Sequence, residues 1–146
     1  MIRLERINID NWFACSQLRV KPEQERFVSS NLLCIAEAQF YPSWGAYAVY
    51  HGEEMVGFAM YEHDAAAEEW WISNLMIASE YQGKGYGRLA LTALLELLVA
   101  KGCLDVLVGY AKDNEGARNL YRSLGFVELG VDDEGDMLAR LGIGIH

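Results

Sequence analysis

A glycine-dense segment at residues 81–88, Tyr-Gln-Gly-Lys-Gly-Tyr-Gly-Arg, constrains the fold more than any other part of the chain. It follows a strand-like run (Trp71–Ile77) and opens a helix-like run (Leu89–Lys101). Glycine adopts backbone conformations closed to other residues and lets a ligand approach the main chain closely. The first turn of a helix has N–H groups without internal partners, so the segment predicts a loop that binds an anion such as a phosphate.

The spacing Gln82-x-x-Gly85-x-Gly87 distinguishes this loop from two common nucleotide-binding motifs. A Walker loop ends in Gly-Lys-Ser/Thr, which this segment lacks, and its glycines do not complete the dinucleotide fingerprint. A plain turn would also contain glycine, but the flanking strand and helix favour a binding role. We therefore expect a different ligand that carries a pyrophosphate.

The order of hydrophobic patterns predicts one α+β domain over residues 1–146, with a mixed, mostly antiparallel sheet flanked by helices. Asp10 is expected to cap a first helix, and Pro22 to open a second helix that continues to Phe40. The three strands in the middle of the chain should be antiparallel neighbours, and only the glycine segment should lie in a parallel crossover. Strands are expected at residues 2–7, 46–50, 55–61, 70–77, 106–110, 126–131 and 137–143.

Two later helices complete the pattern. In the helix after the glycine segment, Arg88, Thr92 and Glu96 recur every fourth residue as a polar stripe, so most sides of this helix should be packed. Asn114 should open the last helix, which Gly125 closes.

Composition limits the classes of protein to consider. With 146 residues and 52% hydrophobic residues, the chain can form one ordinary core. Its longest apolar run is too short to cross a bilayer, so we expect a cytosolic protein without a membrane partner. Three widely spaced cysteines suggest buried thiols, and neither a disulfide framework nor a metal site. The net charge of −9 argues against a nucleic-acid partner and suits a cationic one.

Two motifs occur in an order and separation typical of one family. The first is the loop Gln82-x-x-Gly85-x-Gly87 between strand and helix. The second is Asn114-x-x-Ala117-x-x-Leu120-Tyr121-x-x-x-Gly125-Phe126. Together they resemble the GNAT superfamily of acyl-CoA-dependent N-acetyltransferases, and the resemblance extends over nearly the whole chain. Within that superfamily, the segments at residues 40–47 and 55–61 are similar to bacterial spermine/spermidine acetyltransferases.

The resemblance implies acetyl-coenzyme A (acetyl-CoA) as cosubstrate. Its pantetheine arm would pair with the strand from Leu75 to Ile77 like an added strand, and the Asn114 side chain would hold it from the other side. Lys84 flanks the phosphate region. The backbone amides expected around the pyrophosphate are those of Gln82, Gly83, Gly85, Gly87 and Arg88.

The resemblance places Tyr121 at the position of the general acid, which gives a proton to the departing thiolate. A phenol with a pKa of about 10 stays protonated at neutral pH. The spacing by itself has a simpler interpretation, because Tyr121 shares a helix face with Ala117 and Leu124, as a core tyrosine would. Asn114 likewise suits a plain helix N-cap.

The sequence leaves open which group takes the proton of the amine. An alkylammonium has a pKa of about 10.4 and must lose a proton before its nitrogen can attack. In related polyamine enzymes a carboxylate lies on the strand before the glycine loop, but Ser73 occupies that position here. Glu37 and Glu69 are the nearest carboxylates by sequence. A water chain that ends on Ser73 or on a backbone carbonyl is an alternative.

Other residues suit a cationic substrate. Tyr41 is expected to bind it together with Glu37 and Ser73, although aromatic residues near a loop usually serve packing. The acidic residues at 62, 64, 68 and 69 are typical of a charged loop and also suit a polyamine site.

We therefore expect a GNAT enzyme that transfers acetyl directly, within a ternary complex, to a primary amine of a small polycation such as spermidine or spermine. One alternative is another amine, such as an aminoglycoside, an amino acid or a protein N-terminus. A second alternative is a non-catalytic sensor that binds acyl-CoA. Tyr121 argues against the sensor, and the missing strand carboxylate argues for it. We allow for a homodimer.

Overall fold

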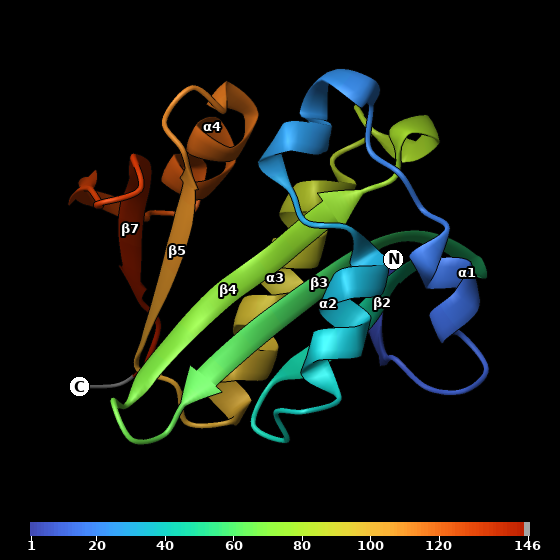
Figure 1. The fold of residues 1–146 in the computed structure, drawn as a ribbon, viewed down its shortest axis with the longest axis horizontal. Helices are drawn as coiled ribbons and strands as arrows, with labels where there is room; N and C mark the ends of the chain where they lie inside the picture. The colour runs from blue at the N-terminus through green and yellow to red at the C-terminus, as the bar shows by residue number, and fades with distance from the viewer. Residues whose placement is uncertain (145–146) are drawn as a thin grey trace.

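The computed structural model describes residues 1–144 and has a seven-stranded sheet with helices on both faces (Figure 1). The predicted α+β class is confirmed. The strands are β1 (Ile2–Arg6), β2 (Gly45–His51), β3 (Glu54–Asp64), β4 (Glu69–Ile77), β5 (Asp105–Ala111), β6 (Val127–Val131) and β7 (Asp136–Gly142). The helices are α1 (Trp12–Ser16), α2 (Asn31–Ala38), α3 (Tyr86–Ala100) and α4 (Glu115–Ser123), with the short 3-10 helices η1 (Pro22–Phe27) and η2 (Ser79–Tyr81).

The strands follow the order β1-β2-β3-β4-β5-β7-β6. All neighbours are antiparallel except β4 and β5, which are parallel and are joined through α3. The antiparallel β2–β3–β4 unit and the parallel crossover at the glycine segment were both predicted, and both are confirmed.

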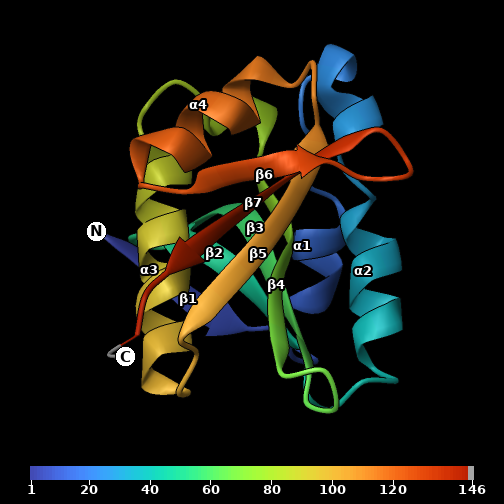
Figure 2. The ribbon, with the colours of Figure 1, turned by 90° about the vertical axis from the view of Figure 1, so that its left-hand side faces the viewer.

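The helices lie in two layers. Figure 2 shows α3 and α4 on one face of the sheet and α1 and α2 on the other. Each layer covers its own hydrophobic core. Cys103 lies in the core under α3, whereas Cys15 and Cys34 lie in the core under α1 and α2. All three thiols are buried and free, as the sequence predicted.

Helix α3 is packed on fewer sides than its composition predicted. Leu89 and Val99 are 49% and 46% exposed. The reason is that α3 lies on one face of the sheet, so its outer side faces solvent together with the predicted polar stripe. None of the helices within residues 1–144 is both long and apolar enough to cross a membrane.

Strands β4 and β5 diverge after a short stretch of pairing. Within the described residues, their register pairs are confined to Trp71 with Leu107 and Ile72 with Val108. Figure 1 shows the two strands separating towards the end that carries α4. The sheet is therefore open at the carboxyl end of β4, where the glycine segment begins.

A bulge lies on the other side of β4, within its pairing to β3. Asn74 pairs with Met60, but Ile72 pairs with Tyr61, so Ser73 is the extra residue. A bulge bends its strand and redirects side chains. This one lies beside the opening between β4 and β5.

The prediction of one helix from Pro22 to Phe40 is wrong. The segment is split into η1 and α2, because Val28 is extended, with φ −134° and ψ 145°. Ser30 then starts α2, since its side chain accepts a hydrogen bond from the Leu33 N–H (3.1 Å). After the break, η1 is linked to the segment that follows β4 through hydrogen bonds between the Gln24 and Gln82 side chains.

Asp10 does not cap the first helix. The N-cap of α1 is Asn11, whose side chain makes no cap hydrogen bond. Instead, Asn11 Oδ1 accepts from the Asn8 N–H (2.8 Å), and its Nδ2 donates to the Arg6 carbonyl (3.0 Å). The side chain therefore ties the turn to β1.

Candidate active site

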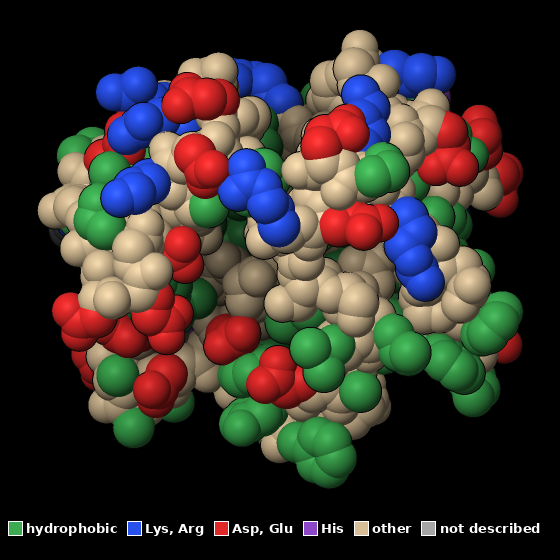
Figure 3. Space-filling model, turned by 45° about the horizontal axis from the view of Figure 1, so that its top comes forward, with side chains coloured by type: hydrophobic (Ala, Val, Ile, Leu, Met, Phe, Trp, Pro, Cys, Tyr) green, Lys and Arg blue, Asp and Glu red, His purple; other side chains and the backbone are tan. Residues whose placement is uncertain are grey.

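The opening between β4 and β5 contains two adjoining cavities. The first cavity, of about 280 Å³, lies beside the glycine segment. The second cavity, of about 150 Å³, lies closer to the paired part of β4 and β5. Figure 3 shows the molecule hollowed between two lobes on this side. The residues that line both cavities are Phe27, Val28, Leu75, Asn114, Ala117 and Tyr121.

The glycine segment presents free backbone donors to the first cavity. Gly83 and Gly85 have φ of +80° and +83°, the left-handed conformation that favours glycine. A Cβ at either position would meet no atom within 4 Å, so the space beside them is open. Within the described residues, no N–H of residues 83–88 donates a hydrogen bond. Such donors at the N-terminus of α3 fit a phosphate group.

Gln82 also lines the first cavity, but its polar groups are engaged. Its Nε2 donates to the Ile77 carbonyl (2.8 Å) and to Gln24 Oε1 (2.8 Å). Its N–H donates to the Ser79 carbonyl (3.4 Å). Gln82 therefore holds the loop between β4 and η1, and the free amides begin at residue 83.

The predicted cations near the loop are exposed. Lys84 lies within the loop itself, and Arg88 lies in the first turn of α3. The Arg88 guanidinium donates to the Ser123 hydroxyl and so links α3 to α4. Gly87 faces β4, where a Cβ would lie 3.8 Å from Ile77 Cγ1.

The end of β4 and the start of α4 form opposite walls. Leu75 and Ile77 line the first cavity from β4. Because pairing with β5 ends at Ile72, this edge of β4 can accept an extended ligand as an added strand. Asn114 faces it from α4, and its Oδ1 accepts from the Ala117 N–H (3.1 Å). The predicted N-cap is confirmed, and the Asn114 Nδ2 group is not used in it.

Tyr121 lies where the two cavities meet and is 6% exposed. Its ring stacks on Tyr110 with centroids 5.7 Å apart and packs edge-on against Phe126 at 5.1 Å. Burial, and to a lesser extent Tyr110, raises the pKa of Tyr121 far above its ordinary value. The hydroxyl therefore keeps its proton. Tyr121 is both a core residue and part of the cavity wall, so the two interpretations of its spacing are compatible.

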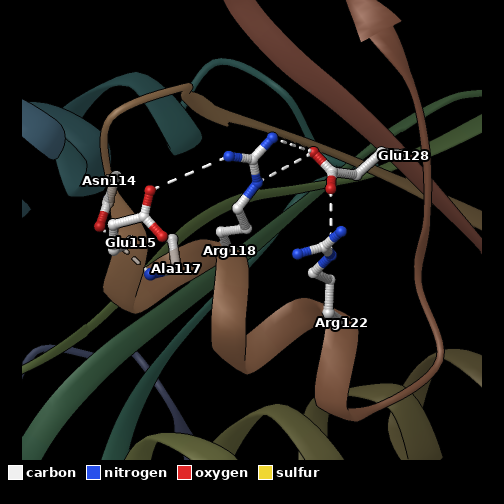
Figure 4. Close-up of polar contacts among 6 residues, drawn as sticks. All are labelled: Asn114, Glu115, Ala117, Arg118, Arg122 and Glu128. Carbon is white, nitrogen blue, oxygen red and sulfur yellow. Dashed lines mark hydrogen bonds and ion pairs between the residues drawn. The ribbon is translucent and has the colours of Figure 1, made fainter.

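An ion-pair network attaches α4, which carries Tyr121, to β6 (Figure 4). Arg118 donates through Nε (3.2 Å) and Nη2 (2.9 Å) to Glu128 Oε2, and Arg122 Nε lies 3.1 Å from Glu128 Oε1. Glu115 lies 3.9 Å from Arg118 Nη1. The Arg118 guanidinium holds the pKa of the Glu128 carboxyl below its ordinary value.

A third pocket, of about 420 Å³, lies beside the β3–β4 hairpin and contains the predicted substrate residue Tyr41. The Tyr41 ring stacks on Trp44, with centroids 4.0 Å apart and planes 8° apart. Glu62, Asp64 and Glu69 also line this pocket. Aromatic faces beside carboxylates suit an alkylammonium ligand. We call this site the acidic aromatic pocket.

Ser73 lies apart from Tyr41, in the wall of the second cavity. The two sites are connected by Glu62, which lines the acidic aromatic pocket and follows the part of β3 that pairs with the β4 bulge. The Ser73 hydroxyl lies close enough to oppose the rise in the pKa of the Glu62 carboxyl. Glu37 is exposed on α2, close enough to Glu62 to raise the pKa of the Glu62 carboxyl. The structure thus brings Glu37, Glu62 and Ser73 together and leaves Glu69 at the start of β4.

Several residues of these cavities were missed from the sequence. Phe27 and Val28 reach the opening only because the predicted long helix is broken there. Tyr110 on β5 stacks on Tyr121 of α4, a contact for which the sequence carries no signal. Asn74 did carry a signal, because it is a polar residue within the mostly apolar run of β4.

Comparison with known proteins identifies the family of this chain. The profile of the Acetyltransferase (GNAT) family matches residues 6–126. The chain is 28% identical over 132 residues to the spermine/spermidine N(1)-acetyltransferase of Bacillus subtilis (strain 168), and the match covers 86% of this chain and 87% of that protein.

Solved structures share the fold. The ribosomal-protein-S18-alanine N-acetyltransferase from Escherichia coli has a TM-score of 0.79 at 20% identity, covering 100% of this chain and 96% of that one. The spermidine N-acetyltransferase from Vibrio cholerae, solved in complex with CoA and spermine, has a TM-score of 0.75 at 17% identity, covering 95% and 92%. At these identities the likeness concerns the fold alone.

Proposed function

The chain belongs to the GNAT family of acetyltransferases, and from this premise we propose that it transfers the acetyl group of acetyl-CoA to a primary amine of a small polycation such as spermidine or spermine. Two curated relatives, both named as spermine acetyltransferases, support the choice of acceptor. The match covers 87% of the length of each.

The observation that carries the proposal is the acidic aromatic pocket next to the second cavity. An ammonium group that enters a protein loses hydration, which a carboxylate or an aromatic face can replace. Glu62, Asp64 and Glu69 supply the carboxylates, and Tyr41 and Trp44 the aromatic faces. Asp and Glu side chains border the lower part of the hollow in Figure 3. A substrate with several ammonium groups could thus bind at both sites at once.

The residues of the first cavity fit acetyl-CoA. The free N–H groups of residues 83–88 would bind its pyrophosphate, and the open edge at Leu75 to Ile77 would pair with its pantetheine arm. Asn114 would hold the arm from α4. When bound, acetyl-CoA supplies an acyl carbon activated as a thioester. Tyr121 lines both cavities and would give the departing thiolate its proton.

Steady-state kinetics with matched mono-, di- and polyamines, at low and high ionic strength, test the acceptor. Spermidine and spermine should outcompete monoamines of equal chain length, because each additional ammonium gains a paired charge. Their apparent affinity should weaken as salt rises, since exposed charges are screened. Glu69→Gln should raise KM for polyamines and leave the KM for acetyl-CoA unchanged.

Two outcomes would contradict the proposal. Equal efficiency on all amines would remove the polyamine preference. Turnover of an aminoglycoside or a peptide N-terminus in place of polyamines would identify a different acceptor for the same fold.

A further inference from the structure

A buried carboxamide beside the second cavity lacks a partner for one of its atoms. Asn74 is 6% exposed and, like Ser29, lines this cavity. Its Nδ2 donates to the Ser29 carbonyl (3.3 Å) and to Cys34 Sγ (3.1 Å). Its Oδ1 has no hydrogen-bond partner among residues 1–144. Because buried acceptors are nearly always paired, this atom points to a donor that a ligand supplies.

Two further acceptors lie next to Asn74. Ser73 is the exposed bulge residue, and its hydroxyl donates to the Met60 carbonyl at 3.3 Å, a long hydrogen bond. The same hydroxyl lies close enough to the Glu62 carboxyl to lower its pKa, so its single proton can turn from the Met60 carbonyl to the carboxylate. No Lys or Arg of the described residues lines the second cavity or the acidic aromatic pocket. Acceptors without a cation fit an ammonium group, which carries only donors.

We propose that Asn74, Ser73 and Glu62 hold the ammonium group of the acceptor and take its proton. The Asn74 Oδ1 accepts one N–H, and the Ser73 hydroxyl accepts the proton that leaves while it passes its own proton to Glu62. This inference rests on the proposed function as an amine acetyltransferase. It supplies the proton acceptor that β4 lacks, because β4 has Ser73 where a carboxylate was expected.

The surroundings of Glu62 suit this role better than those of Glu37 or Glu69. Burial raises the pKa of the Glu62 carboxyl, the Ser73 hydroxyl opposes the rise, and the charge of Glu37 adds to it. A carboxylate with a raised pKa accepts a proton more readily. Glu37 and Glu69 are exposed. The other titratable groups around Glu62 are Cys34, Tyr41, His63, Asp64 and Glu69.

The proton transfers balance. An N–H bond of the ammonium breaks, its proton moves to Ser73 Oγ, and the Ser73 proton moves to a carboxylate oxygen of Glu62. The nitrogen lone pair forms the new N–C bond as the C–S bond of the thioester breaks, and Tyr121 protonates the sulfur. The nitrogen releases its second proton to solvent, which leaves a neutral amide. Tyr121 regains a proton from solvent and Glu62 releases the proton it accepted, so the reaction releases one proton in total.

The first test is the pH dependence of Glu62→Gln, which keeps the shape of the side chain and removes the proton acceptor. At neutral pH, kcat/KM for the amine should fall by about 10²-fold or more. The deficit should shrink as the pH approaches the pKa of the amine, because more substrate then arrives neutral. The control is Glu53→Gln, the same charge change in the exposed turn before β3, which should leave kinetics unchanged.

A second variant tests whether Glu62→Gln loses activity through lost proton transfer or through a change in structure. Adding Ser73→Glu to Glu62→Gln places a carboxylate on β4 and should recover at least about tenfold in kcat/KM. Wild-type kinetics of Glu62→Gln, a deficit of the same size at every pH, or no recovery in the double variant would overturn the proposal.

Binding measurements distinguish this inference from the proposed function. Calorimetry of spermidine with protein saturated with coenzyme A should show at least about tenfold weaker binding to Glu62→Gln, because the variant loses a charged partner. If a different primary amine proves to be the acceptor, the polyamine assignment fails, but Glu62→Gln should still lose that activity. Equal affinity of the wild type and the variant for the acceptor amine would overturn the inference, even where the acetyltransferase activity itself is present.

Discussion

At the scale of a single residue, the ring of Tyr121 serves packing, whereas its hydroxyl is the proposed proton donor. The ring is held between Tyr110 and Phe126, so it would stay in place without its hydroxyl. Tyr121 lines both cavities. A substitution that removes only the hydroxyl therefore tests its role directly.

Tyr121→Phe should lower the rate of acetyl transfer by about 10² to 10⁴-fold, the usual contribution of a general acid. Affinity for acetyl-CoA and the melting temperature should change little, because the ring contacts remain. Since burial raises the pKa of Tyr121, wild-type activity should not decline through the ordinary titration range of tyrosine from loss of this proton. Single-turnover rates measure the effect, with Tyr50→Phe on β2 as control. Near wild-type rates where chemistry limits turnover would reject the role.

Gly85→Val tests the glycine loop. At φ +83° a β-branched side chain is strained by about 1 to 3 kcal/mol, and its methyl groups would occupy the open space that a phosphate needs. Binding of coenzyme A should weaken by at least about tenfold, because charge-assisted hydrogen bonds from the loop are lost.

Gly102 is the matched control position. It has a φ of +93°, also with open space, but lies after α3 and outside both cavities. Gly102→Val should therefore cost similar stability in chemical denaturation and leave the calorimetric affinity unchanged. Equal affinities in the two variants would contradict the assignment.

At the scale of elements, the position of Tyr121 depends on how α4 is attached to β6. Glu128 has a side chain only 17% exposed and lies between Arg118 and Arg122. Its folded-state pKa is lowered, so this carboxylate stabilises the fold above its unfolded-state pKa. The contribution is lost as the pH falls through the folded-state pKa.

Glu128→Gln should therefore lower the melting temperature by a few degrees at neutral pH. The difference from wild type should close in acid, below the lowered pKa of Glu128, because the wild-type carboxyl is then neutral as well. Thermal melts across a pH series measure this, and Glu134→Gln in the exposed β6–β7 turn is the matched control. A gap that stays constant down to low pH would show that the ion pairs do not cause it.

At the scale of the whole molecule, the first cavity joins parts of the chain that lie far apart in sequence. Its walls come from η1, β4, the glycine segment with α3, and α4. A ligand that binds there contacts all of them, so it should stabilise the fold as a unit.

Coenzyme A at about 100 times its Kd should raise the melting temperature by about 5 to 10 °C, because that ratio corresponds to about 2.7 kcal/mol. Differential scanning fluorimetry over a range of coenzyme A concentrations measures the shift. Gly102→Val should retain the full shift, whereas Gly85→Val should lose most of it. No shift in the wild type would argue against a coenzyme A site in this cavity.

Local signals in the sequence determined the elements that begin the site. The glycine segment predicted a loop of free amides before a helix, and Asn114 predicted the N-cap of α4. These features depend on backbone preferences and hydrogen bonds within a few residues, so neighbouring sequence suffices to specify them. The antiparallel β2–β3–β4 unit and the parallel crossover after it followed from the alternation of strand and helix patterns.

The composition of the cavities was decided only by the tertiary structure. The break at Val28 lets residues of η1 line the first cavity together with the end of β4. The bulge at Ser73 brings that residue close enough to Glu62, on the neighbouring strand, to affect the pKa of its carboxyl. The unpaired Oδ1 of Asn74 likewise exists only because α2 and β4 bury it. The physical reason is that burial and contacts between distant segments depend on how the layers pack, which outweighs local propensity and is not encoded in the spacing of any one segment.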